Sequence, residues 1–241
     1  MVFFMRVLIF LAALLCGLPS FAADRCDVDV PVQLADLKEV RIAYQSIGSE
    51  SDPALLLVMG LGGQLIHWPD EVVVALCEQG YRVIRYDNRD FGLSTWVQQP
   101  ADANLTVEVL RYKLGLPVSS PYSLTDMADD ALGLMDALQI RQFHVLGASM
   151  GGMIAQHLAE PSRVELLNRL RLPVLVVHGT ADPLLPVMHG VHVAAHIQGS
   201  QLRLIPGLAH RFQEAFKAPL LGAVLPYLKA RHEDGRNLAQ L

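Results

Sequence analysis

Ser149 stands at the centre of Gly147-Ala148-Ser149-Met150-Gly151, a pattern suited to nucleophilic catalysis. An apolar run precedes the pattern and a helix-compatible segment follows it. Glycines on both sides permit a sharp strand-to-helix turn that lifts the serine hydroxyl clear of a sheet. The turn also places the Met150 N–H at a helix N-terminus, where backbone donors favour developing negative charge. We therefore expect Ser149 to be a nucleophile and Met150 to be an oxyanion donor; the alternative is a plain glycine-rich turn.

Two residues later in the chain can complete this chemistry. A nucleophilic serine needs a base that takes its proton and an acid that orients the base. Asp182 follows the apolar run 174–178, and His210 follows the run 202–205. Ligand sites in open α/β sheets lie at the carboxyl ends of strands, so these positions can converge on Ser149. The alternatives are a helix N-cap for Asp182 and a structural role for His210.

The other histidines are weaker candidates for the base. Of nine histidines, only His210 follows a strand end on a glycine-containing loop late in the chain. His178 falls within an expected strand, so we expect it to be packed or held in one tautomer. His67 is close to a glycine-rich loop, and we expect it near the pocket. No Cys/His spacing matches a metal site, and the chemistry requires neither a metal nor a cofactor.

A glycine-rich loop at residues 59–63 follows the apolar run 54–58. Its Met-Gly-Leu-Gly-Gly sequence lets the backbone turn and expose N–H groups. No Gly-Lys-Ser/Thr follows, which excludes a phosphate-binding P-loop. We expect the Leu61 N–H to be a second oxyanion donor; the alternative is a tight turn without function.

Strand and helix patterns alternate along the chain and imply an α/β fold with a mostly parallel, doubly wound sheet. Continuous apolar runs bounded by turn signals indicate strands buried on both faces. We expect strands at 28–34, 40–48, 54–58, 81–86, 143–147, 174–178 and 202–205, with the first two joined by a hairpin turn. We expect helices at 69–79, 105–114, 123–138, from the Ser149 turn to about 160, and at 187–197 and 212–230. The helix at 105–114 is expected to hang over the site.

Five charged residues near these elements are expected to be structural. Asp87 and Arg89 follow a strand in a polar, turn-rich loop, and we expect them to brace it rather than to act in catalysis. Asp126, Asp129 and Asp130 fill the first turns of the next helix. We expect all three to complement the helix dipole on a solvated face.

The composition suits one globular α/β domain. The chain has 241 residues and is 52% hydrophobic, so it can bury a large core. Its formal net charge is −5 and no dense Lys/Arg cluster occurs. A nucleic-acid partner is therefore not expected.

The N-terminus has the order of a secretory signal. An apolar run of about 12 residues follows Arg6, and small residues stand at Ser20 and Ala22. This run is too short for a comfortable membrane span. We expect residues 1–22 to be removed, leaving 23–241 as a single exported domain in the periplasm or outside the cell. The alternative is an uncleaved N-terminal anchor.

Two cysteines, Cys26 and Cys77, remain after such a cleavage. In an oxidising compartment they can pair. The alternative is two buried or free thiols, because the sequence does not tell whether their Cα atoms lie within reach.

The motifs in their order resemble the α/β-hydrolase superfamily, and within it the esterase-like group that contains the anthracycline methyl-esterases. The resemblance covers most of residues 39–225. It is carried by Met59-Gly60-Leu61-Gly62-Gly63, Tyr86-Asp87-Asn88-Arg89 with Gly92 and Ser94, Gly147-Ala148-Ser149-Met150-Gly151-Gly152, His178-Gly179-Thr180-Ala181-Asp182-Pro183 and Gly207-Leu208-Ala209-His210.

The resemblance implies an α/β-hydrolase fold with Ser149 as the nucleophile and Asp182 and His210 as its relay. It also implies that the N–H groups of Leu61 and Met150 form the oxyanion hole. The implied activity is cleavage of a small-molecule carboxylic ester through an acyl-enzyme. Lactonases, thioesterases and C–C bond hydrolases would use the same triad. A serine at the elbow argues against the haloalkane dehalogenases and epoxide hydrolases of this fold, which carry an aspartate there.

The chain departs from this family between Ser149 and Asp182, which only 32 residues (150–181) separate. Relatives carry a further strand and a helical cap domain in this interval. Residues 162–172 contain no buried-strand run, so we predict that one central strand and the cap domain are missing.

Such a loss would have a geometric consequence. Neighbouring strands lie about 4.8 Å apart. Either the acid-bearing strand moves beside the nucleophile strand and shifts Asp182 and His210 out of reach, or the sheet keeps a gap with unpaired backbone groups. Two hypotheses follow: an exported serine hydrolase, and an internally deleted relative without activity.

Overall fold

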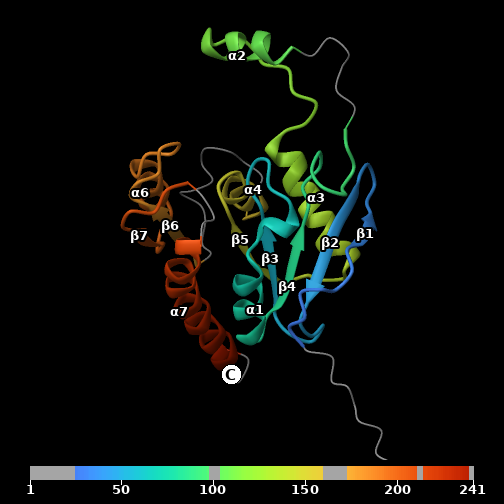
Figure 1. Ribbon diagram of the computed structural model, residues 1–241, viewed down its shortest axis with the longest axis vertical. Helices are drawn as coiled ribbons and strands as arrows, with labels where there is room; N and C mark the ends of the chain where they lie inside the picture. The colour runs from blue at the N-terminus through green and yellow to red at the C-terminus, as the bar shows by residue number, and fades with distance from the viewer. Residues whose placement is uncertain (1–24, 98–103, 160–172, 211–213, 239–241) are drawn as a thin grey trace, which may run out of the picture.

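The computed structural model describes residues 25–97, 104–159, 173–210 and 214–238 (Figure 1). In chain order its elements are β1 (Gln33–Asp36), β2 (Arg41–Ile47), β3 (Ala54–Val58), the 3₁₀ helix η1 (Leu65–His67), α1 (Asp70–Glu78), β4 (Arg82–Tyr86), α2 (Leu105–Lys113), α3 (Leu124–Ala137), β5 (Phe143–Gly147), α4 (Met150–Ala159), β6 (Leu175–Gly179), α6 (Met188–His196), β7 (Gln201–Ile205) and α7 (Glu214–Leu238). From β2 onward these bounds match the predicted elements to within about two residues, except that η1 was not predicted and α7 continues further.

Five strands form a mixed sheet, and two form a separate parallel pair. The larger sheet has the order β1-β2-β4-β3-β5, in which β2 is antiparallel to β1 and β4 while β3 is parallel to β4 and β5. In the smaller sheet β6 and β7 run parallel, from Leu175 opposite Gln201 to Gly179 opposite Ile205. The expected parallel arrangement therefore holds for β3, β4 and β5 and for the β6–β7 pair. The antiparallel β1–β2 pair is the expected N-terminal hairpin, and the described strands form two sheets instead of one.

The first strand lies later in the chain than predicted. The sequence favours a strand at 28–34, whereas β1 begins at Gln33. Pro31 has no N–H to donate to a ladder. The carbonyl oxygen of Val30 instead accepts a hydrogen bond from the Gln45 side chain. Residues before β1 thus pack apolar side chains on the core without joining the sheet.

The larger sheet is buried on both faces. Alternate side chains of a strand point to opposite faces, so Leu56 and Val58 of β3 enter one core and Leu55 and Leu57 enter the other. Helices α3 and α4 cover the first face, and α1 and α7 cover the second (Figure 1). Burying each such side chain contributes about 1.5–3 kcal/mol, so these two cores fix the position of β3 and its neighbour β5.

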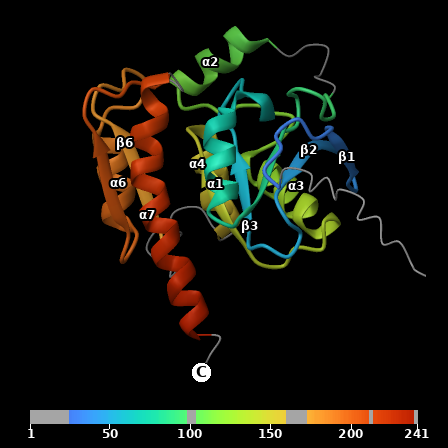
Figure 2. The same cartoon turned by 60° about the horizontal axis from the view of Figure 1, so that its bottom comes forward.

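Helix α7 links the two sheets. Its side chains Leu220, Val224 and Leu228 lie in the same core as α1, and the helix also contacts β6 (Figure 2). Leu146 of β5 and Leu175 of β6 both pack against this core. The described parts of β5 and β6 share no hydrogen bond, so apolar side-chain packing holds the two sheets together there.

Cys26 and Cys77 form a disulfide, with their Cα atoms 5.7 Å apart. The bond joins the segment before β1 to helix α1. Of the two states that the sequence allows, the structure has the paired one.

Two predicted features lie outside the described residues. These are the secretory signal at 1–22 and the segment 160–172, on which the predicted loss of a strand and cap depends. Among the helices that the structure describes, none combines the length and apolar character that a membrane crossing requires.

Candidate active site

Ser149 lies on the tight turn between β5 and α4. Its backbone φ is +53°, in the left-handed region that residues other than glycine rarely adopt. The flanking positions have no room for a side chain, so only glycine fits there. A Cβ on Gly147 would lie 2.3 Å from the Gly151 carbonyl oxygen, and a Cβ on Gly151 would lie 2.1 Å from the Val58 carbonyl oxygen. Glycines at these two positions therefore permit the strained turn, which presents Ser149 at the carboxyl end of β5.

Ser149, His210 and Asp182 are hydrogen-bonded in series. Asp182 Oδ2 accepts a hydrogen bond from His210 Nδ1–H at 2.6 Å, and Ser149 Oγ lies 2.8 Å from His210 Nε2. A neutral imidazole that donates through Nδ1 accepts at Nε2, so the serine hydroxyl donates to the ring. The structure thus brings together the three residues that the sequence selected as nucleophile, base and acid.

The Asp182 carboxylate is buried and oriented by backbone donors. Its side chain is 7% exposed, and Oδ1 accepts the N–H groups of Leu184 and Leu185 at 2.9 Å each. Burial alone would raise the pKa of Asp182, but the Leu185 N–H, the His210 ring and the Leu184 N–H together lower it below its ordinary value. Asp182 is therefore ionised at neutral pH and can stabilise an imidazolium on His210. The alternative of a helix N-cap does not hold, because α6 begins only at Met188.

The triad draws its members from both sheets. Ser149 follows β5 of the larger sheet, whereas Asp182 follows β6 and His210 follows β7 of the smaller one. Within the described residues, β6 remains unpaired with β5, and the acid and the base stay within hydrogen-bond reach of the serine.

The glycine-rich loop after β3 lies against the nucleophile. A Cβ on Gly60 would lie 3.0 Å from Ser149 Cβ, so the loop backbone approaches the serine as closely as glycine allows. The Gly63 N–H donates to the Gly60 carbonyl at 3.1 Å and closes a turn around Leu61. Met150 is the first residue of α4, so its N–H has no intrahelical partner. Both expected oxyanion donors therefore belong to segments that border Ser149.

The described residues leave the site open. Ser149 is exposed, and so are three large apolar side chains on segments that carry the site. Leu61 is 78% exposed, Leu184 is 70% exposed and Met153 is 42% exposed. Helix α2, which was expected to hang over the site, projects well away from the other elements (Figure 1), and almost all of its described side chains are exposed.

Two other histidines have structural roles. His178 Nε2–H donates to the Leu185 carbonyl at 2.9 Å, which holds one tautomer as expected. His67 Nδ1 accepts from the Gln64 N–H at 2.9 Å, so His67 caps η1 close to the glycine-rich loop.

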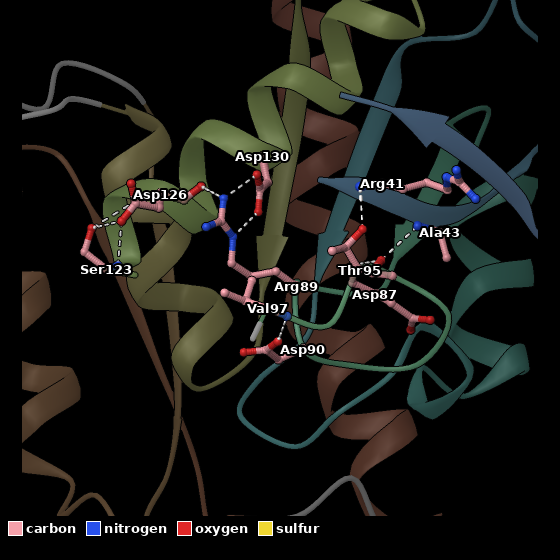
Figure 3. A network of polar contacts seen from close by, with 11 residues as sticks. Arg41, Ala43, Asp87, Arg89, Asp90, Thr95, Val97, Ser123, Asp126 and Asp130 are labelled. Atoms are coloured by element: carbon pink, nitrogen blue, oxygen red, sulfur yellow. Dashed lines mark hydrogen bonds and ion pairs between the residues drawn. The ribbon is translucent and has the colours of Figure 1, made fainter. Parts of the chain in front are cut away.

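Asp87 and Arg89 brace the loop after β4, as the sequence predicts. The Asp87 carboxyl oxygens accept the N–H groups of Leu65 at 2.6 Å and Leu93 at 3.0 Å. Arg89 donates to both carboxyl oxygens of Asp130, at 2.6 and 2.7 Å (Figure 3). The loop is thereby tied to the loop after β3 and to helix α3.

The prediction of a solvated face for Asp130 is wrong. Asp129 is exposed as expected, but Asp130 is only 6% exposed and faces Arg89. Burial raises the pKa of Asp130, and the two hydrogen bonds from Arg89 oppose that effect. The bond to Asp130 in turn raises the pKa of the Arg89 guanidinium. The available signal was helical spacing, since Asp130 lies three residues after the buried Met127 and four before the buried Leu134.

The sequence analysis assigned no role to Asn88, although Asn88 lies in one of the motifs that carry the resemblance. Its side chain is 1% exposed, and Nδ2 donates to the Met59 carbonyl at 3.1 Å. The contact joins the loop after β4 to the loop after β3. The available signal was position, since Asn88 stands between Asp87 and Arg89 just past a strand end.

Comparison with known proteins finds the same architecture. A family model described as alpha/beta hydrolase fold matches residues 53–166. The enol-lactonase from Burkholderia xenovorans LB400 superposes with a TM-score of 0.66 at 18% identity, covering 82% of this chain and 100% of that one. At this level of identity the likeness concerns the fold.

Curated relatives are similar over part of their length. Rhodomycin D methylesterase DauP of Streptomyces sp. (strain C5) is 36% identical over 139 residues, which are 58% of this chain and 41% of that protein. The 3-oxoadipate enol-lactonase 2 of Acinetobacter baylyi is 31% identical over 122 residues, which are 51% of this chain and 37% of that protein. The chain thus spans less than half the length of these two relatives.

Proposed function

We propose that the chain is a serine hydrolase that cleaves a small-molecule carboxylic ester through an acyl-enzyme on Ser149. Its α/β-hydrolase fold and its similarity to known hydrolases support this proposal. The observation that carries the proposal is the series of hydrogen bonds from Ser149 through His210 to Asp182. Similarity to a methylesterase supports an ester as the target bond.

In the first half of the reaction, Ser149 Oγ attacks the ester carbonyl carbon while His210 Nε2 takes the hydroxyl proton. Asp182 stabilises the resulting imidazolium through the Nδ1–H bond. The carbonyl oxygen becomes an oxyanion, for which the N–H groups of Leu61 and Met150 are the donors. When the tetrahedral intermediate collapses, the bond to the alcohol oxygen breaks and His210 returns the proton to the leaving alcohol.

In the second half, water attacks the acyl-enzyme and His210 takes a proton from it. Collapse of the second tetrahedral intermediate breaks the bond to Ser149 Oγ, and His210 reprotonates the serine. The products are one carboxylic acid and one alcohol, and no cofactor takes part.

The exposed apolar side chains around the triad support an apolar substrate. Leu61, Leu184 and Met153 are exposed on segments that carry or border the triad. Each substrate methylene buried on such side chains would contribute about 0.8 kcal/mol. We therefore place esters with apolar acyl or alcohol groups ahead of charged ones.

A lactonase is the second candidate, favoured by the sequence similarity to an enol-lactonase. A lactone is an internal ester, so the same steps apply except that the alcohol stays attached to the acid product. A methyl ester and a lactone of the same carbon chain, compared by kcat/KM, separate the two candidates.

We also propose that the chain works in an oxidising compartment after export. The Cys26–Cys77 disulfide supports this, because such bonds persist outside the reducing cytosol. The N-terminal mass of protein recovered from the periplasm or medium tests it. A mature chain that starts near residue 23 with Cys26 and Cys77 unreactive to alkylation agrees with export. A full-length chain in which both of these cysteines react contradicts it.

The test of hydrolase function is a fluorophosphonate probe on the full chain. A serine activated by a base reacts covalently with the phosphorus, so we expect labelling at Ser149 and none in Ser149→Ala or in denatured protein. If the protein unfolds cooperatively on heating, and is therefore folded, but is not labelled by the probe and hydrolyses no ester, the result would support a non-catalytic relative instead.

A further inference from the structure

Three consecutive polar side chains follow β4 and are buried. Asp87 is 2% exposed, Asn88 is 1% exposed and Arg89 is 8% exposed. Burying polar groups is costly unless each finds a hydrogen-bond partner. The partners of these three side chains lie on different segments around Ser149. The hydrogen bonds therefore connect several segments and do not stabilise the loop after β4 alone.

Asn88 holds the start of the glycine-rich loop. Its Nδ2 donates to the carbonyl oxygen of Met59 at 3.1 Å. This carbonyl belongs to the peptide that joins Met59 to Gly60, and Gly60 is the residue whose backbone lies against Ser149. The bond therefore fixes the peptide plane one residue before the Leu61 N–H.

Asp87 holds the other end of the same loop. One carboxyl oxygen accepts the Leu65 N–H at 2.6 Å, and the other accepts the Leu93 N–H at 3.0 Å. The carboxyl group fills the space beside Gly92, where a Cβ would lie 1.9 Å from Oδ2. The loop from Met59 to Leu65 is thus pinned at both ends by adjacent side chains.

Arg89 anchors this support to the helix layer. Its two hydrogen bonds to Asp130 connect the loop after β4 with α3, which packs against α4 (Figure 3). The loop that bears Leu61 and the helix that begins at Met150 are therefore both tied to α3.

We infer that Asp87 and Asn88 are positioning residues, which set the Leu61 N–H at the oxyanion by clamping the two ends of the loop that carries it. This inference rests on the proposed serine hydrolase function. Neither side chain bonds to a member of the triad, so the effect on the reaction passes through the loop. Oxyanion donors act by being in place before charge develops, and a misplacement of about 1 Å can cost about 100-fold in rate.

The test compares Asn88→Leu with Ser94→Ala in the full chain. Asn88→Leu keeps the volume and removes the bond to Met59. Ser94 lies in the same loop, where its Oγ donates to the Asp87 carbonyl at 2.7 Å and accepts from the Ala43 N–H at 2.8 Å. It therefore supports the loop from the side of β2 without a hydrogen bond to the glycine-rich loop, and it is a matched control.

We expect Asn88→Leu to lower kcat about 10- to 100-fold with KM changed less than about threefold, because a transition-state contact is lost rather than ground-state binding. Ser94→Ala should stay within about threefold of the parent kcat even though it also lowers the melting temperature. Equal kcat losses in the two variants, or a rise in KM alone, would overturn the inference while leaving the proposed function intact.

A second measurement does not depend on turnover. Hydrogen exchange followed by mass spectrometry should show faster exchange in peptides that cover residues 59–65 of Asn88→Leu, and parent-like exchange there in Ser94→Ala. If the parent proves inactive, the proposed function fails and this comparison still decides whether Asn88 clamps the loop. Unchanged exchange in Asn88→Leu overturns the clamp. If that variant does not fold, Asn88→Ser takes its place, because its side chain is too short to reach the Met59 carbonyl.

Discussion

Ser149 Oγ and His210 Nε2 meet at 2.8 Å, although β5 and β7, which carry these residues to the site, belong to different sheets. In intact parallel sheets, ladder hydrogen bonds set the distance between strands. Between β5 and β6, the described residues show apolar packing through α7 instead. Side-chain contacts therefore hold the nucleophile and its base together. Such contacts allow larger shifts between strands than the backbone hydrogen bonds of a ladder.

The packing of α7 should matter more for catalysis than an equally buried side chain elsewhere. We predict that Leu220→Ala lowers the free energy of unfolding by about 2–5 kcal/mol and also lowers kcat, because β6 and β7 lose their support. Ile42→Ala, in β2 on the opposite core, should cost similar stability with kcat preserved below the melting temperature. Denaturant unfolding and ester turnover measure the two effects. Matching kcat values in the two variants would contradict this role of α7.

The two glycines after the nucleophile should respond in opposite ways to alanine. A Cβ on Gly151 would lie 2.1 Å from the Val58 carbonyl oxygen, whereas a Cβ on Gly152 would meet its nearest neighbour at 3.5 Å. Gly151→Ala is expected to lose several kcal/mol of stability and all measurable activity. Gly152→Ala is expected to be neutral or stabilising by up to about 1 kcal/mol, because alanine favours a helix. Thermal melts of both variants check this, and a stable, active Gly151→Ala would argue against the tight turn.

Asp182→Asn should lower kcat by about 10⁴-fold and should also lose the stability that the ionised carboxylate contributes at neutral pH. The amide keeps one acceptor for the Leu184 and Leu185 N–H groups and turns its NH₂ toward His210, which favours the wrong ring tautomer. Single-turnover acylation with an activated ester measures the loss. Near-parental acylation would show that Asp182 does not orient the base.

Acid should destabilise the parent more than the Asp182→Asn variant. The folded-state pKa of Asp182 lies below its ordinary value of 3.8. Its stabilising contribution is therefore present above about pH 4 and is lost as the pH falls through the lower folded value. Urea unfolding at several pH values between about 5 and 2.5 should show a steeper decline for the parent. Parallel curves would mean that the carboxylate gains nothing from its partners.

Reduction of the disulfide should lower the free energy of unfolding without changing the geometry of the triad. The Cys26–Cys77 bond closes a long loop, with a sequence separation of 51, and such cross-links contribute about 2–4 kcal/mol. The Cys26→Ser/Cys77→Ser variant should unfold at lower denaturant concentration while retaining kcat, because the bond joins the segment before β1 to helix α1 and neither element carries a triad residue. A parental midpoint in the double variant would show that the bond contributes nothing.

Features that depend on neighbouring residues could be predicted from the sequence. The glycines around Ser149 are spaced for a turn of five residues, and their steric reason is local. Strand runs and helix periodicity placed most elements, and strand ends selected Asp182 and His210, because the carboxyl ends of parallel strands share an edge. These inferences needed no knowledge of which strand pairs with which.

Only the tertiary structure decided the features that depend on distant partners. It divided the strands into two sheets, paired Cys26 with Cys77, buried Asp130 against Arg89 and directed Asn88 to the Met59 carbonyl. Periodicity shows that a side chain faces inward or outward but not what it meets there. The contact between Ser149 and His210 belongs to this second group, because it depends on packing between two sheets that share no hydrogen bond in the described chain.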